Sequence, residues 1–186
     1  MTPTITYTEE LVARCRKGDQ RAQLEIYNKY YKAMYNTALR IVNDTAEAED
    51  VMQEAFIKAF SKLDSFQGRS TFGAWLKKIT VNLSINSINK NSRYQNVPFE
   101  DALKNEVEEH EGVDVKEAEV NSKVQKILNA LNSLKKSYRV ILTLHLIEGY
   151  DYDEICEILG ISAANCRTSI SRAKESLRTK LLGNEQ

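Results

Sequence analysis

The chain has 186 residues, of which 42% are hydrophobic, and its 26 Lys and Arg residues balance its 26 Asp and Glu residues. This length suits one or two small domains, because a single core commonly forms from about 100 to 150 residues. No run approaches the roughly 20 apolar residues of a membrane span, and the N-terminal stretch lacks the basic-then-apolar order of a signal peptide. We therefore expect a cytoplasmic protein with packed cores.

The balanced total charge hides an uneven distribution. Residues 1–93 carry 14 basic and 10 acidic side chains, residues 94–120 carry 2 basic and 9 acidic ones, and residues 121–186 carry 10 basic and 7 acidic ones. Two mildly basic segments therefore flank an acidic one, an asymmetry that makes nucleic acid a candidate partner.

The three cysteines, Cys15, Cys156 and Cys166, are widely separated and odd in number. This spacing predicts neither a disulfide framework nor a zinc site. Each cysteine lies among apolar helical positions, so we expect buried, reduced thiols.

Helical periodicity dominates the first half of the chain, which predicts an all-α fold. Thr8 is a plausible N-cap for a first helix that stops at Gly18, and Asp19 is the expected cap of the second. The helix that follows Asn43 and Asp44 has an apolar stripe at intervals of three and four residues. The predicted helices are 9–17, 20–42, 45–63 and a fourth that opens at Ser70 or Thr71 and buries Phe72, Trp75, Leu76, Ile79 and Leu83.

Residues 94–120 have no sustained apolar period and read as a flexible acidic linker. Beyond them the sequence predicts helices near 120–134 and 137–148. Asp151 and Glu154 then form a capping-box pattern at the start of a short helix. A break at Gly160 leads to a final helix capped by Ser162, with Cys166, Ile170, Ala173, Leu177 and Leu181 as its core stripe. A short helix, a glycine turn and a longer basic helix are typical of a helix-turn-helix.

The final helix carries a polar and basic face opposite its core stripe. Such a face can enter a major groove, where arginine reads guanine edges and other cations contact phosphates. The alternative is a solvated basic helix end, which the helix dipole favours. This face consists of Arg167, Thr168, Ser171, Arg172, Lys174 and Arg178.

The fourth helix carries a second ridge, and the loop before it has an unusual composition. Asparagine is a mediocre helix former, so several asparagines in one helix suggest that their side chains have a function. The alternative interpretation is a frayed, solvated helix end. The loop at 65–70, SFQGRS, combines an aromatic, an amide, a cation and hydroxyls, which suits unstacked bases of a single strand. Its Phe66 can equally fold back onto the core. The ridge consists of Lys78, Asn82, Asn86, Asn89 and Arg93.

The third helix also has a second face, formed by Asp50, Gln53, Glu54 and Ile57. An acidic strip repels DNA, so it indicates either a basic protein partner or simply a solvated face. An enzymatic function has little support, because the sequence has only two histidines, no HExxH motif, no phosphate-binding glycine loop and no nucleophile elbow. His145 reads as a core or boundary residue. We expect no enzyme, no cofactor and no metal site.

Two long stretches carry a family resemblance. DVMQEAFIKAFSKLDSFQGRSTFGAWLKKITVNLSIN, at 50–86, closely resembles region 2 of bacterial sigma factors of the extracytoplasmic-function group. Residues 134–181 resemble region 4 of the same group. The resemblance implies a region 2-like domain at 1–93, an acidic linker at 94–120 and a region 4-like helix-turn-helix domain at 121–186.

The resemblance also implies a role for each face. Asp50, Gln53, Glu54 and Ile57 would dock on the β′ clamp helices of core RNA polymerase. The −10 element would be captured and melted by the loop and the ridge, and the −35 element would be read by the last helix. The implied −10 residues are Phe66, Gln67, Gly68, Arg69, Ser70, Trp75, Lys78, Asn82 and Asn86, and the implied −35 residues are Ser162, Asn165, Arg167, Thr168, Ser171, Arg172, Lys174 and Arg178.

The implied partners are the polymerase core, including its β subunit, promoter DNA and an anti-sigma factor. The chain departs from the family pattern at residues 164–166 and at Ser171, so the −35 preference is not transferred. Two rival hypotheses are a free-standing helix-turn-helix regulator and an interaction protein that sequesters polymerase. The first gives no role to the acidic strip, and the second gives none to the final helix.

Overall fold

The computed structural model describes residues 7–94 and 122–183, and these residues fold into helices with no strand among them. The predicted all-α class is therefore confirmed. The chain divides into two compact units, residues 1–87 and 88–186, and each is described by itself. The predicted linker lies almost wholly outside the described residues, and the domain limits at 93 and 120 stay predictions. Across the described ranges, no helix combines the length and the apolar character that crossing a membrane requires.

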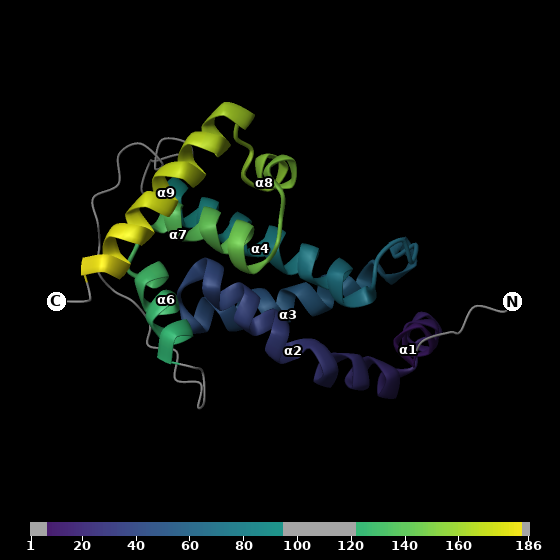
Figure 1. The fold of residues 1–186 in the computed structure, drawn as a ribbon. Helices are drawn as coiled ribbons and strands as arrows, with labels where there is room; N and C mark the ends of the chain where they lie inside the picture. Colours follow the sequence, from purple (N-terminus) through teal and green to yellow (C-terminus); the bar gives the residue numbers. More distant parts are fainter. Residues whose placement is uncertain (1–6, 95–121, 184–186) are drawn as a thin grey trace, which may run out of the picture. The chain divides into compact units, whose positions relative to one another are not determined.

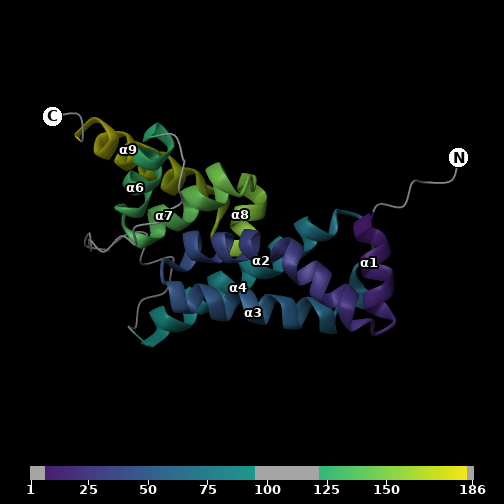
Figure 2. The same cartoon turned by 90° about the horizontal axis from the view of Figure 1, so that it is seen from below.

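The first unit is built from four helices and a short 3-10 turn (Figure 1). Figures 1 and 2 show α2 and α3 running side by side, with α1 lying across the end of the unit where α2 begins. The 3-10 turn and the loop after it lead into α4, and the turn packs on α1. The elements are α1 (Tyr7–Arg16), α2 (Gln20–Val42), α3 (Thr45–Ser61), η1 (Leu63–Ser65) and α4 (Phe72–Tyr94). The last residues of α4, from Ile88 onward, are counted with the second unit.

Local capping sets where these helices begin. The Asp19 carboxylate accepts hydrogen bonds from the backbone N–H groups of Ala22 and Arg21. The bond from Ala22 and then that from the Arg14 guanidinium lower the pKa of Asp19. Asp44 caps α3 in the same way. The prediction for Thr8 was wrong: α1 already begins at Tyr7, and the Thr8 hydroxyl instead accepts a hydrogen bond from the Lys29 ammonium at 2.6 Å.

The core of the first unit joins α1, α2, α3, the turn η1 and the start of α4. Apolar side chains from all five segments form one buried cluster, which includes Leu11, Ile26, Phe56, Leu63 and Leu76. The predicted stripe of the third helix is buried, except that Phe60 is half-buried and Leu63 belongs to η1. Burial of this continuous cluster supplies the main driving force for folding the unit.

The second unit contains the remaining helices. Its elements are α6 (Ser122–Asn132), α7 (Lys136–Leu142), the π-helical turn η2 (Thr143–Ile147), α8 (Tyr152–Leu159) and α9 (Ala163–Gly183). The helix predicted at 137–148 is present, but its second half is wound as a π-turn with a backbone bond from Glu148 N–H to Thr143 C=O at 3.0 Å. His145 is half-buried there, as expected of a boundary residue, and its ring lies 5.2 Å from that of Tyr152.

The helix-turn-helix is formed by α8 and α9. Both bonds of the predicted capping box are present: Glu154 N–H donates to the Asp151 carboxylate, and Asp151 N–H donates to the Glu154 carboxylate. Gly160 ends α8 at a φ of 66°, in the left-handed region. Ser162 begins α9 by accepting from Asn165 N–H at 3.3 Å, as predicted.

Gly160→Ala should destabilise the second unit by roughly 1 kcal/mol, because a Cβ at this positive φ is strained even though the space around it is open. Urea unfolding followed by circular dichroism measures the change. Gly183→Ala is the matched control, since Gly183 has neither a positive φ nor a close neighbour. Equal stability of Gly160→Ala and the parent protein would show that the turn relaxes without cost.

The cysteines follow the expectation in two of three cases. Cys15 and Cys166 are buried free thiols, whereas Cys156 is only half-buried. Burial raises the pKa of the Cys166 thiol to about 11, so it stays protonated near neutral pH. Cys15 and Cys166 therefore serve as packing residues.

Candidate nucleic-acid interface

The outward face of α9 is polar and basic because its other face is fixed in the core. Cys166, Ile170, Ala173 and Leu177 are buried, and Leu181 is half-buried. Most residues on the opposite side of the helix are therefore exposed, although Ser169 beside the stripe is buried. Of the predicted −35 residues, Ser162, Arg167, Thr168, Ser171, Arg172 and Arg178 are exposed, while Asn165 and Lys174 are half-buried.

Several of these side chains already have bonds within their own helix. The Thr168 hydroxyl donates to the Ala164 carbonyl at 2.9 Å, and the Asn165 amide oxygen accepts from the Ser169 hydroxyl at 3.2 Å. Arg178 pairs with Glu175 at 2.6 Å, but both side chains are about two-thirds exposed, so the pair is weak. Arg167, near the start of α9, is exposed.

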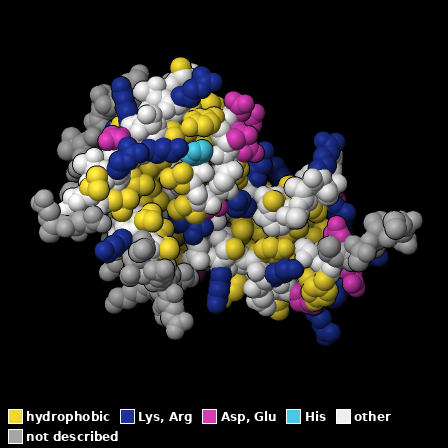
Figure 3. All heavy atoms as spheres, viewed as in Figure 1, with side chains coloured by type: hydrophobic (Ala, Val, Ile, Leu, Met, Phe, Trp, Pro, Cys, Tyr) yellow, Lys and Arg dark blue, Asp and Glu magenta, His cyan; other side chains and the backbone are white. Residues whose placement is uncertain are grey.

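Charge distinguishes the two helices of the motif. The exposed side chains of α8 include the acids Asp153, Glu154 and Glu157, whereas those of α9 include Arg167 and Arg172. Figure 3 shows both kinds of charge on the visible face of the molecule, with Lys and Arg in dark blue and Asp and Glu in magenta. Phosphates repel acids, so the α9 face is the one suited to DNA.

The acidic strip on α3 is exposed to the solvent. Asp50, Gln53 and Glu54 are exposed, and Ile57 is 70% exposed. The neighbouring Val51, Met52, Ala55 and Phe56 are buried, so the strip cannot turn inward without unfolding the helix. An exposed isoleucine beside carboxylates gives a small surface with both an apolar and an acidic component.

The Phe66 ring is turned into the core and away from the solvent, while the implied part of Phe66 in −10 capture stays a prediction. The ring is 8% exposed and packs edge-on against Phe72 at 5.7 Å and tilted against Trp75 at 5.2 Å. Folding back onto the core, one of the two alternatives left open by the sequence, is what the structure shows. Trp75 is itself half-buried within this aromatic cluster.

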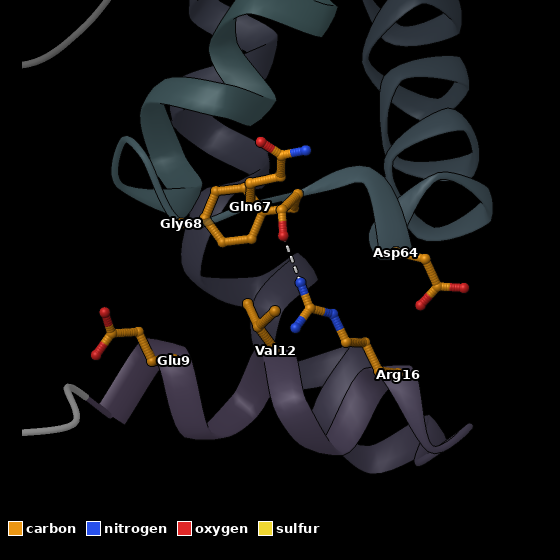
Figure 4. A pocket seen from close by; sticks show the side chains of 7 residues that line it. Glu9, Val12, Arg16, Asp64, Gln67 and Gly68 are labelled. Atoms are coloured by element: carbon orange, nitrogen blue, oxygen red, sulfur yellow. Dashed lines mark hydrogen bonds between the residues drawn. The ribbon is translucent and has the colours of Figure 1, made fainter.

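The residues after Phe66 form the accessible part of the loop. Gln67, Gly68, Arg69 and Ser70 are all exposed, and Gly68 has a φ of 68°. A hollow of about 500 Å³ lies beside them, between this loop and α1 (Figure 4). Its walls combine the Phe66 and Val12 side chains with the charged groups of Glu9, Arg16 and Asp64.

The polar ridge of α4 lies close in sequence to this loop. Thr71 caps the helix, since its hydroxyl accepts from Ala74 N–H at 3.3 Å. Lys78, Asn82 and Asn86 are exposed at intervals of four residues, whereas Asn89 is half-buried. The Arg93 side chain lies outside the described ones. The loop before α4 and the ridge on α4 therefore both expose amide and cationic side chains.

Phe66→Ala should lower the stability of the first unit by about 3 kcal/mol, because it removes a buried ring from an aromatic cluster. Thermal unfolding of the full chain measures the loss. Phe66→Leu is the control, since it keeps most of the apolar volume and should recover most of the stability. A stability loss below about 0.5 kcal/mol in Phe66→Ala would contradict the burial of the ring.

Sequence reasoning missed Arg16. Its guanidinium donates to the Phe66 carbonyl and lies 3.4 Å from the Leu63 carbonyl, which ties α1 to the turn before the loop. About 50 residues separate the partners in sequence, so no local pattern could indicate the contact. Among the described residues there is also no cluster of His, Cys, Asp or Glu that could hold a metal ion.

Comparison with known proteins places these faces in a family context. The family model described as Sigma-70 region 2 matches residues 26–94, and the model described as Sigma-70, region 4 matches residues 124–177. The ECF RNA polymerase sigma factor SigW of Bacillus subtilis is 33% identical over 180 residues, covering 91% of this chain and 94% of the relative. The ECF RNA polymerase sigma-E factor of Haemophilus influenzae is 30% identical over 181 residues, covering 93% and 94%.

Two solved structures share the fold. The sigma factor RpoE, in complex with the anti-sigma factor NepR from Bartonella quintana, has a TM-score of 0.56 at 23% identity and covers 87% of this chain and 97% of its own. CnrH, in complex with the cytosolic domain of CnrY, has a TM-score of 0.53 at 22% identity and covers 95% and 97%. At this identity the likeness concerns the arrangement of helices.

Proposed function

The chain belongs to the sigma-70 family, in its ECF group, whose members direct RNA polymerase to promoters without being enzymes themselves. On that premise we propose that it binds bacterial core polymerase, recognises −35 and −10 elements, and assists the melting of promoter DNA. The polymerase supplies the chemistry.

The observation that carries the proposal is that two faces of opposite character are fixed outward on separate units. The α9 face, with Arg167 and Arg172, suits duplex DNA, and the α3 strip, with Asp50 and Glu54, repels it. A protein that only bound DNA would have no use for the strip. A surface that excludes DNA and carries exposed Ile57 suits a basic protein groove, and the β′ clamp helices are the proposed partner.

The −10 element is assigned to the exposed part of the loop and to the α4 ridge. Amides can both donate to and accept from the edges of unpaired bases, and Arg69 and Lys78 can neutralise phosphates. With the Phe66 ring buried, we propose that Phe66 holds the loop in place while Gln67 to Ser70 and Asn82 make the contacts. Capture of an extruded base would then favour the melted strand.

Partners beyond the core enzyme follow from the relatives. The two structural neighbours were each solved with a protein bound, and the first is named as an anti-sigma factor. We propose that an anti-sigma factor also restrains this chain, and that both proteins meet in the cytoplasm where the polymerase works. The acidic segment 94–120 is proposed to thread a basic channel of the polymerase.

Selection from random duplex DNA tests the proposal. The reconstituted holoenzyme should enrich two motifs at a fixed spacing, while core polymerase without the protein should enrich neither. Enrichment of one motif by the protein alone, unchanged by polymerase, would favour the free-standing regulator. Tight polymerase binding with no enriched motif would favour the sequestering protein.

A further inference from the structure

We propose that Arg16 is a positioning residue for −10 recognition, acting from α1 through the backbone of the loop that follows η1. This inference rests on the proposed function, because it explains what shapes the loop that we propose contacts the melted DNA strand. The residue itself lies outside the −10 and −35 assignments.

The contacts of Arg16 bracket the turn before the loop. Its Nε and Nη2 atoms each lie 3.4 Å from the Leu63 carbonyl oxygen, and Nη2 also donates to the Phe66 carbonyl. Figure 4 shows the guanidinium pointing from α1 toward the loop, with this bond drawn as a dashed line. One planar group thus contacts two carbonyls three residues apart, and its fork of donors is rigid, whereas a lysine ammonium is a point charge on a flexible stem.

Three further contacts restrain the path of the backbone through this loop. Phe66 N–H donates to Leu63 C=O at 3.1 Å, which closes η1. The Phe66 ring packs against Phe72 and Trp75, and these contacts restrain the backbone at Phe66. Gly68 then turns the chain at positive φ toward Thr71, the cap of α4.

The exposed loop residues depend on these restraints because they have little support of their own. Gln67 and Arg69 make no hydrogen bond to any other residue that the structure describes, and Ser70 makes one at the long distance of 3.5 Å to the adjacent Thr71 carbonyl. Their directions are therefore set by the backbone at Phe66. Without Arg16, the Phe66 carbonyl loses its partner and the exposed segment gains freedom that it must give up again on binding DNA.

Substitution of Arg16 should leave the fold intact. Its side chain is exposed overall, lies at the last position of α1 and is not part of the buried core cluster. Removing it therefore tests the loop and not the core. Lys17→Ala is the matched control, since it removes one exposed positive charge at the next residue, with no side-chain contact described.

The experiment is a selection with holoenzymes containing the wild-type protein, Arg16→Ala, Arg16→Lys or Lys17→Ala. The probe is a pool of short single-stranded DNA with a central randomised stretch, and the readout is the base preference of the bound fraction. We expect the wild type and Lys17→Ala to prefer particular bases. Arg16→Ala should lose roughly threefold to tenfold of that preference, and Arg16→Lys should be intermediate.

Each other outcome overturns a defined part of the proposal. Full preference in Arg16→Ala would overturn the positioning role while leaving −10 recognition intact. An equal loss of affinity for every sequence, shared with Lys17→Ala, would make Arg16 a phosphate contact and also overturn it. No preference in the wild type would refute the proposed function of the loop, and the inference with it. If Arg16→Ala failed to fold, Arg16→Lys with full preference would refute the role.

Discussion

Reversing the charge of the α3 strip should cost this protein most of its affinity for core polymerase. Glu54→Lys and Asp50→Lys each place a cation where the proposed partner is basic, so attraction becomes repulsion. We expect each variant to bind at least about tenfold more weakly, equivalent to about 1.4 kcal/mol. Both side chains are exposed, so neither substitution disturbs the buried face of α3.

Competition between labelled wild-type protein and each variant for core polymerase measures the effect. Glu10→Lys is the control, because Glu10 is an exposed acid of the same unit that lies on α1 and outside the strip. It should compete as well as the wild type. Wild-type affinity in Glu54→Lys and Asp50→Lys would remove the docking assignment. Weaker binding by Glu10→Lys as well would indicate a general effect of net charge.

Arg167→Ala should lose binding at one position of the −35 element. An arginine on the first turns of a recognition helix can make a bidentate contact with guanine, and loss of such a contact costs roughly 1–3 kcal/mol. The loss of affinity caused by Arg167→Ala should vanish on a duplex in which the contacted base pair has already been changed. Holoenzyme affinity for matched and changed duplexes gives the comparison.

Arg178→Ala provides the contrast for this prediction. Arg178 lies about three turns further along α9 and is paired with Glu175, so its removal should weaken binding to all sequences slightly and equally. If Arg167→Ala behaved in the same way as Arg178→Ala, Arg167 would be a phosphate contact. The base-reading role would then belong to another residue of the face.

The helices and their caps were largely predictable because their causes are local. Asp19, Asp44 and the pair Asp151–Glu154 bond to backbone groups within three residues, and the apolar stripes repeat at helical spacing. Thr8 failed as a cap because its hydroxyl has a partner in α2, 21 residues away. The π-turn after Leu142 could not be predicted either, because its apolar sequence would suit an ordinary α-helix equally well.

The site was predictable in its residue types and less so in its geometry. Exposure of Arg167, Asp50 and Asn82 follows from helical periodicity once the core face is known. The burial of Phe66 depends on Phe72 and Trp75 beyond a glycine turn, and the Arg16 contact spans 50 residues. Both are tertiary contacts, so composition could list the loop's residues without saying which of them face the solvent.

Transcription from a genomic DNA library, with purified core polymerase and mapping of transcript 5′ ends, tests whether this protein directs polymerase to promoters. Adding the protein should create new start sites that share two upstream elements, near −35 and −10, at a constant spacing. Start sites unchanged by the protein, although it binds core polymerase and duplex DNA, would show that it is not a promoter-specificity subunit.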